Sequence, residues 1–113
     1  MAVQSAIHRI RAQVRRMLHR LNKTGTDPSN ADRALWGALV VAHFASATRR
    51  AEDAQTDPET VLSDLLADLM HWCDAQRSNG QLQESIGFDS ALERASDYYK
   101  EERSDELERD GGI

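Results

Sequence analysis

Two carboxylates and an imidazole stand at helical spacing near the middle of the chain. Asp64, Asp68 and His71 are four and three residues apart in the segment SDLLADLMHWCDA, so a helix would present them on one face. Carboxylate oxygens and imidazole nitrogens suit a divalent cation, but established helical sites draw their ligands from facing helices. We therefore interpret the three residues as a solvated face that could contact a partner, and we expect no metal and no other cofactor.

Apolar residues occupy the opposite arc of the same predicted helix, where Val61, Trp72 and Cys73 are expected to belong to the core. The acidic residues lack the paired-glutamate ExxE pattern with which all-α nucleotide pyrophosphatases hold magnesium. The chain also has no nucleophile elbow, phosphate-binding glycine loop or HExxH sequence. The sequence thus predicts a non-enzymatic protein, with a metal-dependent pyrophosphatase-like enzyme as the second alternative.

Arginines near the N-terminus are the strongest interaction feature. They are Arg9, Arg11, Arg15, Arg16 and Arg20. Such a set can give salt-dependent affinity for nucleic acid or for an acidic surface. It could also pair with the acidic C-terminal half of the chain or simply be solvated. The sequence contains no helix-turn-helix pattern that would indicate sequence-specific reading of DNA. We expect a protein partner, with nucleic-acid binding through this helix as the first alternative.

The net charge of −5 conceals an asymmetry between the two halves. Residues 1–50 hold nine Lys and Arg against two Asp and Glu, whereas residues 51–113 hold five against seventeen. This polarity could bring the halves together, recruit separate partners, or pair molecules head to tail.

A basic amphipathic helix is predicted over residues 2–23. Its apolar residues alternate at steps of four and three and form a narrow seam of Val3, Ile7, Ile10, Val14, Met17 and Leu21. Gly25 is expected to take the left-handed conformation beyond its end.

A second helix is predicted from about residue 28 to residue 55. Because residues 35–45 are apolar on nearly every side, that helix should be buried all round or shared with a second subunit.

The start of the third predicted helix is clearly marked. Thr56 or Asp57 should cap it, with Pro58 in its first turn and Glu59 placed to complete a capping box on Thr56. It should end near residue 77. A fourth helix should be capped by Asp89 or Ser90, and the charged tail, residues 103–113, is expected to fray.

Length and composition bound the architecture. With 113 residues, 40% hydrophobic content, two prolines and six glycines, the chain predicts one all-α domain over residues 1–113, a small bundle of about four helices. We expect a homodimer through the second helix or the seam of the first.

The longest apolar run, residues 35–45, is far shorter than the roughly 20 residues of a membrane span. No signal-peptide pattern opens the chain, and the single Cys73 fits a reducing cytoplasm.

One resemblance adds context. The segments LSDLLADLMHWCDA and FDSALERASDYYKEE resemble a set of small, largely uncharacterised bacterial proteins carried on phages, plasmids and other mobile elements. The likeness covers roughly residues 60–102 and leaves out the basic N-terminal helix. It implies no catalytic residues. It implies a protein that acts by binding a macromolecule of the host or the element, as an accessory factor, a regulator or an anti-CRISPR-like inhibitor of host defence.

Overall fold

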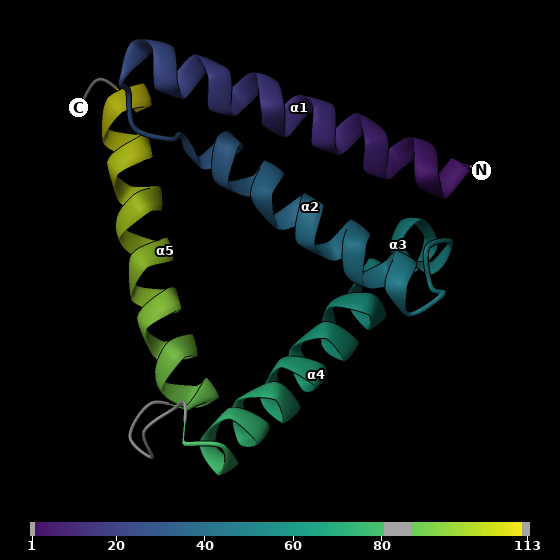
Figure 1. Ribbon diagram of the computed structural model, residues 1–113. Coiled ribbons are helices and arrows are strands. Elements are labelled where there is room, and N and C mark those ends of the chain that lie inside the picture. The colour runs from purple at the N-terminus through teal and green to yellow at the C-terminus, as the bar shows by residue number, and fades with distance from the viewer. Residues whose placement is uncertain (1, 81–86, 112–113) are drawn as a thin grey trace. The chain divides into compact units, whose positions relative to one another are not determined.

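The computed structural model describes residues 2–80 and 87–111, and every regular element in these ranges is a helix. The helices are α1 (Ala2–Thr24), α2 (Asn30–Ala47), α3 (Asp53–Thr56), α4 (Pro58–Ser78) and α5 (Phe88–Gly111) (Figure 1). The predicted all-α class is confirmed. The chain divides into two compact units, Met1–Ser63 and Asp64–Ile113, with the boundary inside α4.

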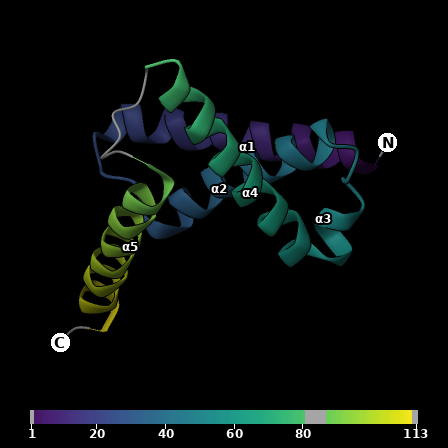
Figure 2. The same ribbon diagram turned by 90° about the horizontal axis from the view of Figure 1, so that it is seen from below.

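In the first unit, α1 and α2 run antiparallel and side by side (Figures 1 and 2). Ile7, Val14 and Met17 of the predicted seam are buried, as is Ala45 of α2, which is only 1% exposed. The seam of α1 therefore packs within its own chain, where burial of large apolar side chains stabilises the pair. The side chain of Val3 lies outside the described part of the structure.

Two local signals place the turn between α1 and α2. Gly25 has a φ of 68°, the left-handed conformation expected for it, and its N–H donates to the carbonyl oxygen of Leu21 over 2.8 Å. Ser29 then caps α2 through a capping box, because its Oγ accepts from the N–H of Asp32 and its own N–H donates to the Asp32 carboxylate. This box starts α2 at Asn30, two residues beyond the predicted start.

The predicted continuous helix from about residue 28 to residue 55 is wrong, because α2 ends at Ala47 and α3 is separate. Arg49 takes a left-handed φ of 62°. Its N–H donates to Ser46 over 3.2 Å and that of Arg50 donates to Ala45 over 2.7 Å. These two bonds form the Schellman arrangement that closes a helix. Neither glycine nor proline marks the position, so the sequence carries no ordinary stop signal there.

Of the two residues predicted to cap the N-terminus of α4, Asp57 is the one that does so. Its carboxylate accepts the N–H of Thr60 over 3.3 Å and the Thr60 hydroxyl over 2.7 Å. The hydroxyl of Thr56 donates instead to the carbonyl of Glu52. Among the described side chains, Thr60 rather than Glu59 is thus the first-turn partner of the cap.

The apolar side of α4 is only partly covered. Val61 is fully buried and Cys73 is 9% exposed, but Trp72 is 55% exposed, so its predicted place in the core is wrong. Large side chains along α4 and α5 share this exposure, namely Leu62, Leu66, Leu69, Met70, Leu92, Tyr98, Tyr99 and Leu107. The reason is that α4 and α5 do not pack along each other within the described residues.

Helix α5 begins at Phe88, one residue before the first predicted cap, and continues through Gly111. Residues 103–111 of the tail that was expected to fray are therefore helical, and residues 112–113 lie outside the described part. Over the described residues, none of the helices combines the length and apolar character required to cross a membrane.

Candidate functional site

The five predicted arginines all lie on α1, and each is exposed to solvent. We call them the basic face; they are Arg9, Arg11, Arg15, Arg16 and Arg20. Helix α1 also contains Lys23 and no Asp or Glu, so no carboxylate of the helix itself offsets their charge. At 1.5 Å per residue the 23-residue helix extends about 34 Å. The basic face flanks its buried seam, with Arg9, Arg16 and Arg20 on one side of the seam and Arg11 and Arg15 on the other.

Two members of the basic face are tied to α2. The Nη2 of Arg20 lies 2.6 Å from the Oδ1 of Asp32 in an ion pair. The Nε and Nη2 of Arg11 lie 3.3 and 3.2 Å from the Nε2 of His43. His43 therefore links α2 to α1 through Arg11. Both contacts are made inside the α1–α2 pair and not with the acidic C-terminal half.

The contacts of Asp32 lower the pKa of its carboxyl below the usual value of 3.8. The backbone N–H of Ser29 is the largest cause and the guanidinium of Arg20 is the next, since both donate hydrogen bonds to the charged form. The carboxylate thus serves the cap of α2 and the link to α1 at once, and it neutralises part of the charge of Arg20.

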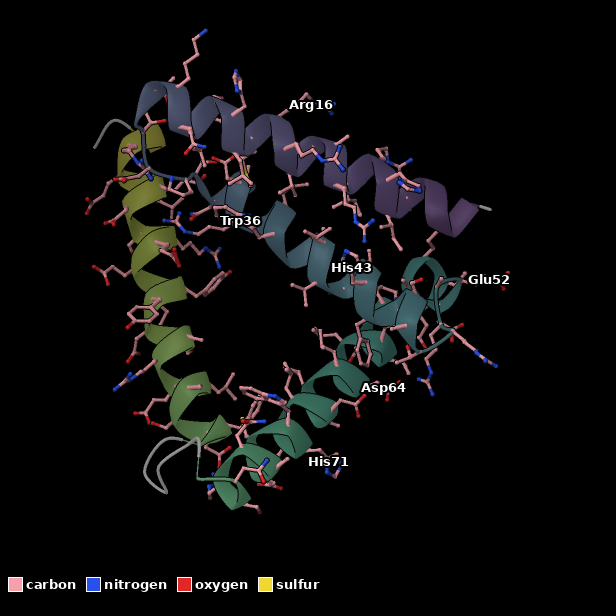
Figure 3. The ribbon with its side chains drawn as sticks, viewed as in Figure 1. Arg16, Trp36, His43, Glu52, Asp64 and His71 are labelled. Carbon is pink, nitrogen blue, oxygen red and sulfur yellow. The ribbon has the colours of Figure 1, made fainter. Side chains whose placement is uncertain are left out.

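Arg9, Arg15 and Arg16 differ from these two. Within residues 2–80 and 87–111, none of the three forms an ion pair or a hydrogen bond through its side chain. Figure 3 shows Arg16 directed away from α2. At about 100° per residue, Arg9 and Arg16 fall within roughly 20° of each other on the helix. Three guanidinium groups are therefore open to an anionic partner without breaking any described internal contact.

A concave apolar surface adjoins the basic face in the first unit. It encloses about 260 Å³ between α1, α2 and α3. Ile7 and Ile10 of α1 line it together with alanines of α2 and α3, and Arg9 is the charged member of the described lining. This pocket is not among the features predicted from the sequence. Its available signal is the recurrence of small residues on one side of α2, at Ala38, Ala42 and Ala45.

The second predicted face lies on α4. Asp68 and His71 are exposed, whereas Asp64 is half-buried with its Oδ2 shielded from solvent. Figure 3 shows Asp64 and His71 projecting from the same side of the helix. Across the described ranges, no three His, Cys, Asp or Glu side chains gather closely enough to hold a metal ion.

Comparisons of the chain with protein-family models, with curated proteins and with solved structures found no match. The resemblance to proteins of mobile elements therefore stays a prediction.

Proposed function

We propose that this chain is a non-enzymatic binding module that holds a partner macromolecule at the basic face of α1, and that the partner is a protein with an acidic surface. The observation behind the proposal is the exposure of Arg9, Arg15 and Arg16 without partners among the described residues. Arginine is the residue best suited to such contacts, because its planar guanidinium binds a carboxylate through two parallel hydrogen bonds.

The rigid mounting of these arginines favours binding. The buried seam of Ile7, Val14 and Met17 fixes α1 against α2, so the backbone carrying the guanidinium groups is ordered before a partner arrives. Preorganisation of this kind lowers the entropic cost of association. The uniform positive charge of α1 would also accelerate encounter with an acidic partner, an effect that weakens as salt is added.

Nucleic acid is the second candidate partner. It is favoured by the absence of any Asp or Glu from α1, because a phosphate backbone meets no repulsion along that helix. In a mobile-element setting either partner would make the chain an accessory factor, a regulator or an inhibitor of host defence.

A homodimer forms part of the proposal. The seam of α1 is packed within the chain, which leaves the outward side of α2 as the route to a second copy. Val40 on that side is 54% exposed, and burial of such side chains is the usual driving force of subunit association.

The proposal is tested by capture from a lysate of the native cell, with and without nuclease, followed by identification and purification of the captured molecule. Wild-type protein is compared with the triple variant Arg9→Glu, Arg15→Glu, Arg16→Glu. The matched control is Arg94→Glu, Lys100→Glu, Arg103→Glu, which changes the charge equally on exposed positions of α5. The purified partner is then titrated against all three proteins.

We expect nuclease-resistant capture of a protein whose Kd is raised at least tenfold by the α1 variant and less than twofold by the α5 control. Contacts of exposed charges should also weaken with added salt. Capture that disappears with nuclease would instead establish nucleic acid as the partner. Equal binding by the α1 variant and the wild type would overturn the assignment of the basic face.

A further inference from the structure

The apolar pocket beside Arg9 bears on what the basic face recognises. Of the described residues that line it, nine are Ala, Ile or Val, and the remaining two are Arg9 and Gln55. Its floor includes Ala45, which is 1% exposed, and Ile7, which is 8% exposed. The pocket is thus an apolar recess set into the packed α1–α2 pair, with a cationic group on its lining.

The recess is large enough for one side chain of a partner. A cavity of about 150 Å³ lined by apolar side chains accepts benzene, so 260 Å³ accommodates a leucine or a phenylalanine side chain. Alanine methyl groups create this space, since larger residues at the same positions would fill it. Moving an apolar side chain from water into the recess favours binding, because apolar surface is removed from water.

The pocket also distinguishes between classes of partner. A phosphate backbone has no group that gains from an alanine-lined recess, and its contacts would be confined to the arginines. An acidic polypeptide can use both surfaces, because its carboxylates suit the guanidinium groups and an apolar side chain suits the recess. The charge of the lining and its apolar character together favour a peptide.

We propose that the module recognises an acidic peptide segment whose apolar anchor side chain enters the pocket while a neighbouring carboxylate pairs with Arg9. This inference rests on the proposed function and deepens it. Arg16 lies seven residues beyond Arg9, about 10.5 Å along the helix, on nearly the same side. A peptide in the polyproline II conformation repeats every three residues and rises about 3.1 Å per residue, so its side chains three positions apart lie on one side about 9 Å from each other. A second carboxylate three positions from the first therefore completes the pattern.

The test is selection of a displayed library of random 12-residue peptides on the full chain, repeated on two variants that fill the pocket. Ala38→Leu fills it from α2 and Ala54→Leu fills it from α3; each residue lines the pocket and neither is fully buried. Ala34→Leu, on an exposed position of α2 outside the lining, is the matched control. Circular dichroism checks that each variant keeps its helical content.

We expect enrichment of peptides with one large apolar residue flanked by Asp or Glu. A synthetic peptide of the enriched sequence should bind at least tenfold more weakly to both filled variants, and its version with serine at the anchor should lose as much on the wild type. The control should stay within twofold. Arg9→Gln should weaken the same peptide, because it removes the guanidinium beside the pocket.

The inference and the proposed function fail in different ways. Enrichment of acidic peptides without an apolar anchor, with equal binding to the filled variants, would overturn the pocket as the recognition element and leave the basic face standing. A library that yields no acidic sequences, together with partner binding unaffected by charge reversal at Arg15 and Arg16, would overturn both.

Discussion

An arginine at the end of α2 occupies a backbone conformation that favours glycine. Arg49 has a φ of 62°, and a non-glycine residue pays about 1–2 kcal/mol in the left-handed region. The two Schellman hydrogen bonds from Arg49 and Arg50 compensate for this cost. The conformation is therefore maintained by the closure of the helix and not by the preference of the residue.

Arg49→Gly is expected to raise the free energy of unfolding by about 0.5–1 kcal/mol, because glycine removes the steric cost while its greater unfolded-state entropy offsets part of the gain. Urea denaturation of the full chain measures the change. Ala47→Gly, in the last turn of α2, is the control and should lower stability by up to about 1 kcal/mol. A destabilising effect of Arg49→Gly would show that the arginine side chain outweighs its backbone strain.

The functional arginines also differ at the level of single residues. Arg11 and Arg20 have partners on α2, whereas Arg9, Arg15 and Arg16 have none among the described residues. All five have the same chemistry in the sequence. The structure separates two arginines that contact α2 from three that are open to a partner, and this separation depends on how α1 packs against α2.

At the level of the helices, the carboxylate of Asp32 contributes both to the start of α2 and to the contact between α1 and α2. Asp32 completes the capping box of α2 and accepts the ion pair from Arg20 of α1. Its lowered pKa means that the folded state favours the charged form more than the unfolded state does. The stabilisation is therefore fully present above the unfolded pKa and is lost as the pH falls through the folded pKa.

Asp32→Asn should accordingly destabilise the protein at pH 7, and its difference from the wild type should shrink below about pH 4, near the unfolded pKa of an aspartate. Urea denaturation in steps from pH 7 to pH 3 measures the difference. Asp68→Asn, on an exposed position of α4, is the control for removal of a carboxylate. A constant difference between Asp32→Asn and the wild type across this range would contradict the role assigned to the charged form.

For the molecule as a whole, the uneven charge follows the division into units. Met1–Ser63 contains nine Lys and Arg against six Asp and Glu, and Asp64–Ile113 contains five against thirteen. A basic and an acidic unit in one chain offer surfaces of opposite sign to different partners. Several large apolar side chains are also exposed, including Val40 in the first unit and Trp72 in the second.

The homodimer proposed through α2 predicts a mass in sedimentation equilibrium of twice the chain mass at micromolar concentration. Val40→Glu should raise the dimer Kd at least tenfold, since it places a charge at the centre of an apolar contact. Leu107→Glu, at an exposed position of α5, should leave the Kd within twofold. A wild-type chain that sediments as a monomer at all concentrations would rule out this dimer.

Local patterns in the sequence were sufficient for the helical class, the limits of α1 and the Gly25 turn, and they narrowed the cap of α4 to Thr56 or Asp57. Each depends on side-chain chemistry or periodicity within a few residues of the feature itself. The exposure of the five arginines also follows from periodicity, because they fall outside the apolar seam of α1.

Tertiary packing decided what remained. The pairing of Arg20 with Asp32 and the pocket between α1, α2 and α3 each depend on residues brought together from separate elements. Trp72 stays exposed because periodicity identifies an apolar side of a helix but not whether another element covers it. Burial and pairing depend on long-range contacts, and these are established only when the helices pack.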